Sequence, residues 1–507
     1  MNNPVRIRSK PPSTKLVSPY LGHLNDDDRE NQIKQPTADK KSVDREDCRA
    51  INSTLRRSSS HYSTQPTAHH EPAFSHSAAW VTEAAYAQSL RESDLYKQDL
   101  YRSALNESDL RSESERGIGI WAELAKLRYI FSLFLATRAV LVLIGLVSYA
   151  TLPRGYGNQT TWSNKLWLDM WGVWDSLWYM DIAQNGYSVA MKLADYPDQT
   201  NFPFFPLYPL LMRFLGYFTG GDAFIAGLIV SNSCLILACY LLYKLAEMEW
   251  GSAIARRSVK YLFLFPVSFI LSGVFTESLY LCLSLSCFYL AKRRRWWLAG
   301  LCGGLLSATR TLGVLIALPL LVEYIRSKDF NFTSFSRTNF RFINLRERLR
   351  LNALFVFLIP TGLLAFSYYN YRLTGDFLFF KTNQAAWDRE IMNPLLSLAR
   401  SLSQGIGEPS FKKLLECAFF VGAFGLLTAF YRRIGFAYWL LGMYSIWIPL
   451  SAGVASMPRF TLPIFPLFFV LAILSQRKWW NRWLTLSLGA LQGALMVLWC
   501  TGQGLVI

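Results

Sequence analysis

Long apolar runs begin at Leu127 and follow one another to about residue 500. The hydrocarbon core of a bilayer is about 30 Å thick and takes on the order of 20 helical residues to cross. Helices are expected because backbone N–H and C=O groups find no water inside lipid and must bond within their own segment. We therefore predict an all-α polytopic membrane protein with about 11 transmembrane or re-entrant helices, over residues 127–150, 222–243, 260–275, 277–291, 297–309, 311–326, 352–372, 413–431, 435–455, 460–475 and 482–500.

Charge divides the chain into two parts. Residues 1–126 hold 18 Lys and Arg against 18 Asp and Glu, so the net charge of +17 lies entirely in the apolar part. Clusters of Lys and Arg stay on the cytoplasmic side of a membrane. This rule predicts a cytoplasmic N-terminus, external loops over 151–221 and 373–412, and external turns near Glu277 and Arg310. The clusters assigned to the cytoplasm are 244–260, 292–295, 326–350, 432–433 and 477–482.

The N-terminal part has the composition of a disordered chain. Residues 1–116 are rich in Ser, Thr, Gln and charged residues, with few aromatic residues and no sustained apolar period. Such a segment cannot offset its own ordering entropy, so we predict a disordered tail over 1–116 and a membrane domain over 117–507. All five histidines precede Leu127, which excludes a Ser-His-Asp relay, a His base or a His-ligated metal in the membrane domain.

The first external loop is the segment richest in chemically active side chains. Trp174, Trp178 and Tyr179 surround Asp175, and such aromatic residues prefer the bilayer interface. A carboxylate among them is partly withdrawn from water, which suits it to general-base catalysis. Asp181 lies six residues further on, on a different face of a helix, so the two carboxylates do not form an acid–base pair. The alternative is an aromatic belt in which Asp175 merely faces water.

Glu277 occupies the predicted turn between two short helices. It either orients the loop of Asp175, binds a substrate, or is an acidic residue favoured in the first turn of a helix. The three interpretations remain open at the level of the residues alone.

Four motifs follow one another in the membrane domain: W-D-S-L-W-Y-x-x-I-A-x-x-G-Y at 174–187, N-F-P-F-F-P-L-Y-P-L-L at 201–211, F-T-E-S-L-Y at 275–280 and A-T-R-T-L-G-V at 308–314. Together they resemble the bacterial relatives of PIG-V, the second mannosyltransferase of GPI-anchor synthesis, within the GT-C class of polytopic glycosyltransferases. The resemblance covers about residues 125 to 475. The tail has no counterpart in it.

The resemblance implies a GT-C-like helical bundle in which a hexose, with mannose the first choice, moves with inversion from a polyprenyl- or dolichyl-phosphate donor. The acceptor would be a hydroxyl of a glycan, glycolipid or protein on the non-cytoplasmic face. Asp175 falls on the aspartate that serves as base in this class. The same resemblance favours a bacterial inner membrane, or the endoplasmic reticulum in a eukaryote, and no nucleic-acid partner.

A lipid phosphate leaving group needs its negative charge held, and cationic side chains can do so. The candidates are Arg310, Arg459, Lys381 and Arg389. The alternative for each is a side chain that extends to the interface only to solvate its charge. Trp174, Trp178, Tyr179, Asp181 and Glu277 are candidates for binding the acceptor or orienting the loop. No D-x-D sequence occurs in the external segments, so no obligatory metal or other cofactor is predicted.

Two other classes of protein share some of these features. A transporter or flippase would also have many spans and intramembrane charges, but it is expected to show two similar halves, and we find no internal repeat. A structural membrane subunit would not need acidic and aromatic residues gathered in loops on one face. The glycosyltransferase interpretation accounts for both observations.

Overall fold

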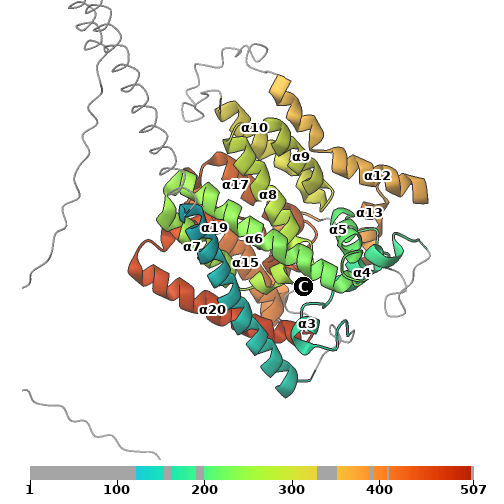
Figure 1. Cartoon of the computed structure of the whole chain (residues 1–507), viewed down its shortest axis with the longest axis horizontal. Helices are drawn as coiled ribbons and strands as arrows, with labels where there is room; N and C mark the ends of the chain where they lie inside the picture. Colours follow the sequence, from blue (N-terminus) through green and yellow to red (C-terminus); the bar gives the residue numbers. More distant parts are fainter. Residues whose placement is uncertain are drawn as a thin grey trace, which may run out of the picture. The chain divides into compact units, whose positions relative to one another are not determined.

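The structure is a computed structural model in which residues 121–153, 161–189, 199–327, 351–387, 392–407 and 410–503 are described. All regular secondary structure in these ranges is helical (Figure 1). The prediction of an all-α protein is therefore confirmed for the described part of the chain. The predicted tail over 1–116 and its boundary with the membrane domain lie outside the described residues.

Most of the helices are short, and many are separated by turns of only a few residues. After a first helix at Trp121–Thr151, the elements in chain order are α3 (Leu166–Asp169), α4 (Ser176–Asn185), α5 (Leu207–Gly216), α6 (Ala223–Trp250), α7 (Ser252–Leu264), η2 (Ser268–Ser272), α8 (Glu277–Lys292), α9 (Trp296–Ser307), η3 (Thr311–Ile316), α10 (Ala317–Arg326), η4 (Leu351–Leu358), α12 (Thr361–Thr374), α13 (Phe379–Thr382), η5 (Asn383–Trp387), α14 (Pro394–Gly407), α15 (Phe411–Ala429), α16 (Tyr431–Ile434), α17 (Phe436–Leu450), α18 (Met457–Thr461), α19 (Pro466–Leu474) and α20 (Lys478–Cys500).

Four helices in the described ranges are long and apolar enough to cross a membrane. They are Trp121–Thr151, α6, the continuous stretch Leu351–Thr374 formed by η4 and α12, and α20. At about 1.5 Å per residue, each is long enough to cover the hydrocarbon core of a bilayer. Three shorter helices, α5, α9 and α17, are also apolar. The chain is accordingly an integral membrane protein.

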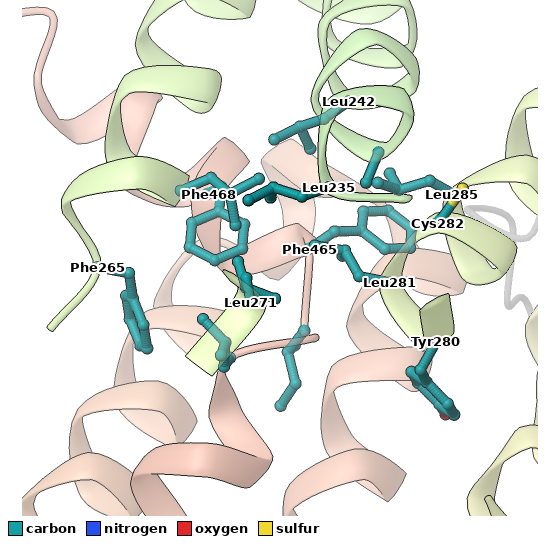
Figure 2. Packing of buried hydrophobic residues seen from close by; sticks show 14 of the residues in the cluster. Leu235, Leu242, Phe265, Leu271, Tyr280, Leu281, Cys282, Leu285, Phe465 and Phe468 are labelled. Carbon is teal, nitrogen blue, oxygen red and sulfur yellow. The ribbon is translucent and has the colours of Figure 1, made fainter. Parts of the chain in front are cut away.

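The centre of the bundle is formed by α6, α7 and α8, and α19 packs against α7. Leu235 and Leu242 of α6 meet Leu285 of α8, and Phe465 and Phe468 fill the same space (Figure 2). Such dense apolar packing fixes α6 and α8 side by side. As a result the first residues of α8 lie near the beginning of α6, where Ser231 Oγ donates to the carbonyl of Phe275 at 3.4 Å.

The predicted span over 260–275 is not one continuous helix. Helix α7 ends at Leu264, and Pro266 follows, which removes a backbone donor and interrupts the helix. The freed backbone carbonyls are bonded by side chains from other helices. Gln492 Nε2 donates to the carbonyl oxygens of Phe263 and Phe265 at 2.7 and 3.1 Å, and Arg138 Nη2 donates to that of Ser268 at 3.2 Å. A broken helix is tolerated inside a membrane protein when neighbouring side chains satisfy it in this way.

The proline-containing motif at 201–211 leads into α5, which carries Pro209. Tyr208 on one face of α5 is buried. Leu210 and Phe214 of the same helix, and Tyr217 directly after it, are more than half exposed. This pattern fits a helix that lies against lipid. The N–H of Leu207 donates to the carbonyl of Ala308 at 3.1 Å, which ties the start of α5 to the turn that carries Arg310.

Candidate active site

The turn before α4 places Asp175 at the edge of the bundle. Trp174 has a φ of 53°, in the left-handed region that non-glycine residues rarely adopt, and the chain reverses there. Two hydrogen bonds fasten this turn to the segment before α8: the N–H of Val274 donates to the carbonyl of Trp171, and Ser176 Oγ donates to the carbonyl of Val274, both at 3.2 Å. The turn of Asp175 is therefore held against the start of α8.

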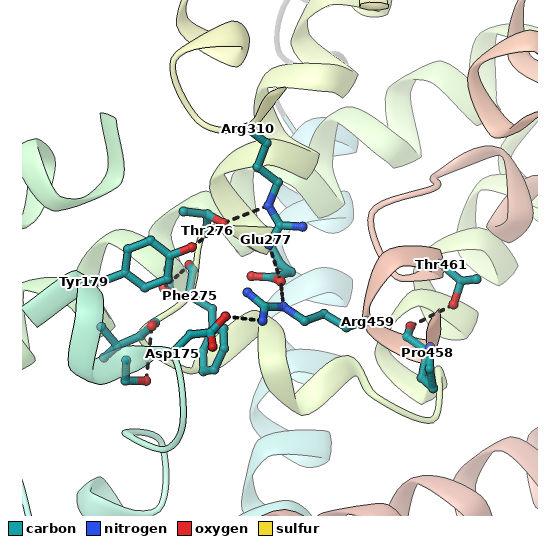
Figure 3. A network of polar contacts seen from close by, with 12 residues as sticks. Asp175, Tyr179, Phe275, Thr276, Glu277, Arg310, Pro458, Arg459 and Thr461 are labelled. Atoms are coloured by element: carbon teal, nitrogen blue, oxygen red, sulfur yellow. Dashed lines mark hydrogen bonds and ion pairs between the residues drawn. The ribbon is translucent and has the colours of Figure 1, made fainter. Parts of the chain in front are cut away.

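Four charged side chains meet at this point, and we call them the four-charge cluster: Asp175, Glu277, Arg310 and Arg459 (Figure 3). Arg459 donates through Nη1 to Asp175 Oδ2 and through Nε to Glu277 Oε1. Arg310 donates through Nη2 to the same Glu277 oxygen. The cluster thus contains two carboxylates and two guanidinium groups, with Arg459 between the two acids.

Glu277 is the centre of the cluster and is fully buried. Burial alone would raise the pKa of its carboxyl group, but Arg310 and Arg459 outweigh this effect and lower the pKa below its ordinary value. Its second carboxylate oxygen, Oε2, is buried and has no hydrogen-bond partner among the described residues. A buried acceptor without a donor is costly, so this oxygen has the capacity to accept one more hydrogen bond.

Arg459 is held from three sides. It lies on the five-residue helix α18, its guanidinium stands over the Phe275 ring at 4.8 Å, and it pairs with both acids. Burial opposes its charge, but the neighbouring Asp175 and Glu277 raise the pKa of its guanidinium well above the usual range. A permanently charged, pre-oriented guanidinium matches the geometry of a phosphate group.

Arg310 lies where α9 has ended and η3 begins. A Cβ at Gly313 would stand 2.3 Å from the carbonyl oxygen of Leu306, so only glycine lets η3 fold back so closely against α9. The Arg310 Nε donates to Thr276 Oγ1 at 3.0 Å. The close packing at Gly313 therefore helps to fix the direction of the Arg310 side chain.

A small cavity adjoins the cluster on the side of Arg310, with Tyr280, Phe460 and Pro463 among its walls. It encloses about 20 Å³, room for about one water molecule. A phosphate or a sugar needs more space than this, so a substrate that reaches Arg310 from this side has to displace neighbouring side chains.

The predicted aromatic residues have different positions. Tyr179 is buried, and its hydroxyl lies 3.3 Å from Thr276 Oγ1, beside the cluster; burial raises its pKa to about 12. Trp178 is buried and stacks on Phe204 with ring centroids 5.7 Å apart, so it supports the turn from behind. Trp174 is half-buried at the turn itself.

Asp181 belongs to another network. It is buried and accepts hydrogen bonds from Asn185 Nδ2 at 2.8 Å and Asn201 Nδ2 at 2.7 Å. These bonds join α4 to the segment that leads into α5. Asp181 therefore contacts α4 and the segment before α5, and its described hydrogen bonds do not reach the four-charge cluster.

The two remaining basic candidates belong to the predicted external loop over 373–412. Lys381 lies exposed on α13, and none of the described contacts joins it to the four-charge cluster. Arg389 lies outside the described residues. Within the described ranges, no three His, Cys, Asp or Glu side chains converge in a way that could hold a metal ion.

Two residues that contact the cluster escaped the sequence analysis. Thr276 bonds Arg310 and Tyr179, and Phe275 supports Arg459. The two residues directly precede Glu277 in the F-T-E-S-L-Y motif. Their place in this motif could have indicated a role, but neither residue carries a charge that distinguishes it from its apolar surroundings.

No known protein-family profile matches the chain. It is 28% identical to GPI mannosyltransferase 2 of Yarrowia lipolytica over 205 residues, which are 39% of this chain and 53% of that protein. The chain thus matches about half the length of this relative.

Two crystal structures of ArnT from Cupriavidus metallidurans, one bound to undecaprenyl phosphate and one in the apo state, give a TM-score of 0.41, with 12% and 13% identity over 74% of this chain and 76% of theirs. The chain is similar in sequence, over the matched stretch, to a mannosyltransferase.

Proposed function

We propose that this protein is a GT-C-type membrane glycosyltransferase that moves a hexose, with mannose the first choice, from a polyprenyl-phosphate donor to an acceptor hydroxyl with inversion. The observation that carries the proposal is the partly buried pairing of Asp175 with Arg459 beside Glu277 and Arg310. It puts a carboxylate that can accept a proton next to two cations that can hold a phosphate. The partial similarity to a mannosyltransferase supports the choice of sugar.

The reaction would proceed in one displacement. The acceptor hydroxyl gives its proton to Asp175 while its oxygen bonds to the anomeric carbon, and the bond from that carbon to the phosphate oxygen breaks. The lipid phosphate leaves with the electron pair of that bond. A positioned general base contributes roughly 10²–10⁴-fold, and Arg310 and Arg459 stabilise the charge that grows on the phosphate.

The ion pairs also suggest how donor binding prepares the base. A phosphate that takes the hydrogen bonds of Arg459 would replace Asp175 as its partner, because a guanidinium pairs with phosphate as readily as with a carboxylate. Asp175 would then be free to receive a proton from the acceptor. Glu277 would keep both arginines in place, since it contacts each of them.

The remaining assignments belong to the same proposal. The reaction face would be the non-cytoplasmic one, with a cytoplasmic N-terminus, in a bacterial inner membrane or the endoplasmic reticulum. Lys381 and Arg389, in the external loop over 373–412, would be further contacts for the donor phosphate. The acceptor would be a glycan, glycolipid or protein, and no obligatory metal would be needed.

The test is Asp175→Asn in purified protein reconstituted into lipid, with polyprenyl-phosphate-mannose as donor. We expect the variant to fold and insert, and turnover to fall by about 10²-fold or more because the general base is lost. Asp181→Asn is the matched control, since it removes the same charge from α4, the helix that follows Asp175, and retains an acceptor oxygen. Turnover like that of the wild type in Asp175→Asn would remove Asp175 from the mechanism.

A further inference from the structure

The linker that leads into α18 has an unusual backbone. Between α17 and α18 the chain contains two residues with positive φ, Gly453 at 118° and Ser456 at 64°. Glycine adopts such angles freely, but a serine there is strained and persists only when its surroundings hold it. Ser456 directly precedes the helix that carries Arg459. The direction of that short helix therefore depends on a strained residue.

A buried carboxylate from another helix reaches this strained residue. Glu416 of α15 is 2% exposed, and its Oε1 accepts a hydrogen bond from the backbone N–H of Ser456 at 3.2 Å. Forty residues separate the two in sequence, and α15 packs along α18. Burying a carboxylate is costly unless it is bonded, so the presence of Glu416 here is unexplained by packing alone.

The contact lies close to Arg459 along the chain. Helix α18 has five residues, and Arg459 is the third of them, three positions after Ser456. The N–H of Phe460 donates to the Ser456 carbonyl at 3.0 Å. A helix of this length has little internal cooperativity of its own. Rotation at Ser456 would therefore move the Arg459 guanidinium away from Asp175 and Glu277.

We propose that Glu416 is a positioning residue: it fixes the left-handed turn at Ser456 and thereby sets the direction of Arg459 within the four-charge cluster. The inference rests on the proposed function for its effect on catalysis, but not for its effect on the turn. Glu416 itself touches neither arginine nor acid of the cluster in the described contacts, so its influence is transmitted through the backbone of α18.

The first measurement follows steady-state kinetics of glycosyl transfer. In Glu416→Ala we expect kcat to fall by on the order of tenfold to 10²-fold, the size of loss that a displacement of about 1 Å can cause. The KM for the donor should change less, because the Arg459 contact strengthens as charge grows on the leaving phosphate. Glu416→Gln keeps an acceptor oxygen for the Ser456 N–H and should retain most of the wild-type kcat.

A second substitution tests the route of the effect. Ser456→Gly removes the strain of the left-handed angle, so Glu416→Ala combined with Ser456→Gly should regain part of the lost kcat. Equal losses in Glu416→Gln and Glu416→Ala, or no recovery in the double variant, would overturn the proposal.

Hydrogen exchange measured by mass spectrometry gives a readout that needs no activity. Amides of residues 451–461 should exchange faster in Glu416→Ala than in the wild type and in Glu416→Gln. Ser410→Ala is the control, because it removes a side-chain cap at the start of the same helix without touching Ser456. Unchanged exchange over 451–461 in Glu416→Ala would contradict the positioning role, whereas a wild-type protein without turnover would contradict only the proposed function.

Discussion

Two networks of ion pairs lie near different positions along α6. They differ in the kind of backbone segment that carries their residues and in the exposed fraction of their side chains. The four-charge cluster lies near Ser231, whose Oγ contacts the carbonyl of Phe275 at 3.4 Å. The second network, which we call the Glu123 network, joins the first helix to α6 and consists of Glu123, Lys126, Lys244 and Glu247. Along α6 the distance from Ser231 to Lys244 is about 20 Å, at 1.5 Å per residue.

The Glu123 network is made entirely of residues on regular helices. Its N–O distances of 2.6–3.7 Å are those of ordinary ion pairs, and its side chains are 15–38% exposed. In the four-charge cluster the side chains are 0–17% exposed and come from turns or the first residues of helices, beside two non-glycine residues with positive φ. Buried charge combined with backbone strain marks functional sites more often than either feature alone. The comparison therefore separates a network that joins two helices from the cluster for which a catalytic role is proposed.

The largest predicted effect breaks the four-charge cluster at its centre. Arg459→Met leaves the partly exposed Asp175 without its arginine and the buried Glu277 with Arg310 alone, and removing one partner of a buried ion pair typically costs about 3–5 kcal/mol. We expect a correspondingly lower free energy of unfolding and loss of sugar transfer, measured by thermal unfolding in detergent and by turnover in liposomes. A variant as stable and active as the wild type would refute the functional distinction between the networks.

A smaller effect is expected where a buried carboxylate supports the loop without touching the cluster. Asp181→Ala removes the acceptor for the exposed Asn185 and the buried Asn201, and leaving a buried donor unpaired costs about 1–3 kcal/mol. The melting temperature should fall while turnover per folded molecule stays close to that of the wild type. A selective loss of turnover without loss of stability would instead assign Asp181 to the site.

The next effect concerns the neutral hydroxyl beside the cluster. Tyr179→Phe removes one contact to Thr276, worth about 0.5–1.5 kcal/mol. Because burial raises the pKa of Tyr179 to about 12, the phenol stays protonated as the pH rises through the ordinary tyrosine value of about 10. The dependence of turnover on pH up to about that value should therefore be the same in Tyr179→Phe and the wild type. A basic limb present only in the wild type would show that Tyr179 titrates during the reaction.

The smallest effect is expected in the Glu123 network. Lys244→Met is the same type of substitution as Arg459→Met, but partly exposed ion pairs typically contribute about 0.2–1 kcal/mol. Turnover should not change, and the melting temperature should change little. If Lys244→Met and Arg459→Met had equal effects on turnover, the contrast between the two networks would have no functional meaning.

Individual members of the site could be predicted from the sequence because charged residues in apolar surroundings are rare and usually functional or paired. Asp175, Glu277, Arg310 and Arg459 all stood out in this way. Their pairing could not be predicted, since Arg459 and Asp175 are 284 residues apart. Glu416 gave no signal either, because two lysines shortly before it in the chain make an acidic residue look like an ordinary surface partner.

Apolar runs of sufficient length determined that the chain is a helical membrane protein, since lipid leaves the backbone no other way to satisfy its hydrogen bonds. The break at Pro266 after α7 also has a local cause, although the predicted span over 260–275 ran through it. Only the tertiary structure decided which charges share one buried space, which of two nearby aspartates meets an arginine, and which distant carboxylate holds a strained turn. Those outcomes depend on the packing of helices far apart in sequence, and no local pattern encodes that packing.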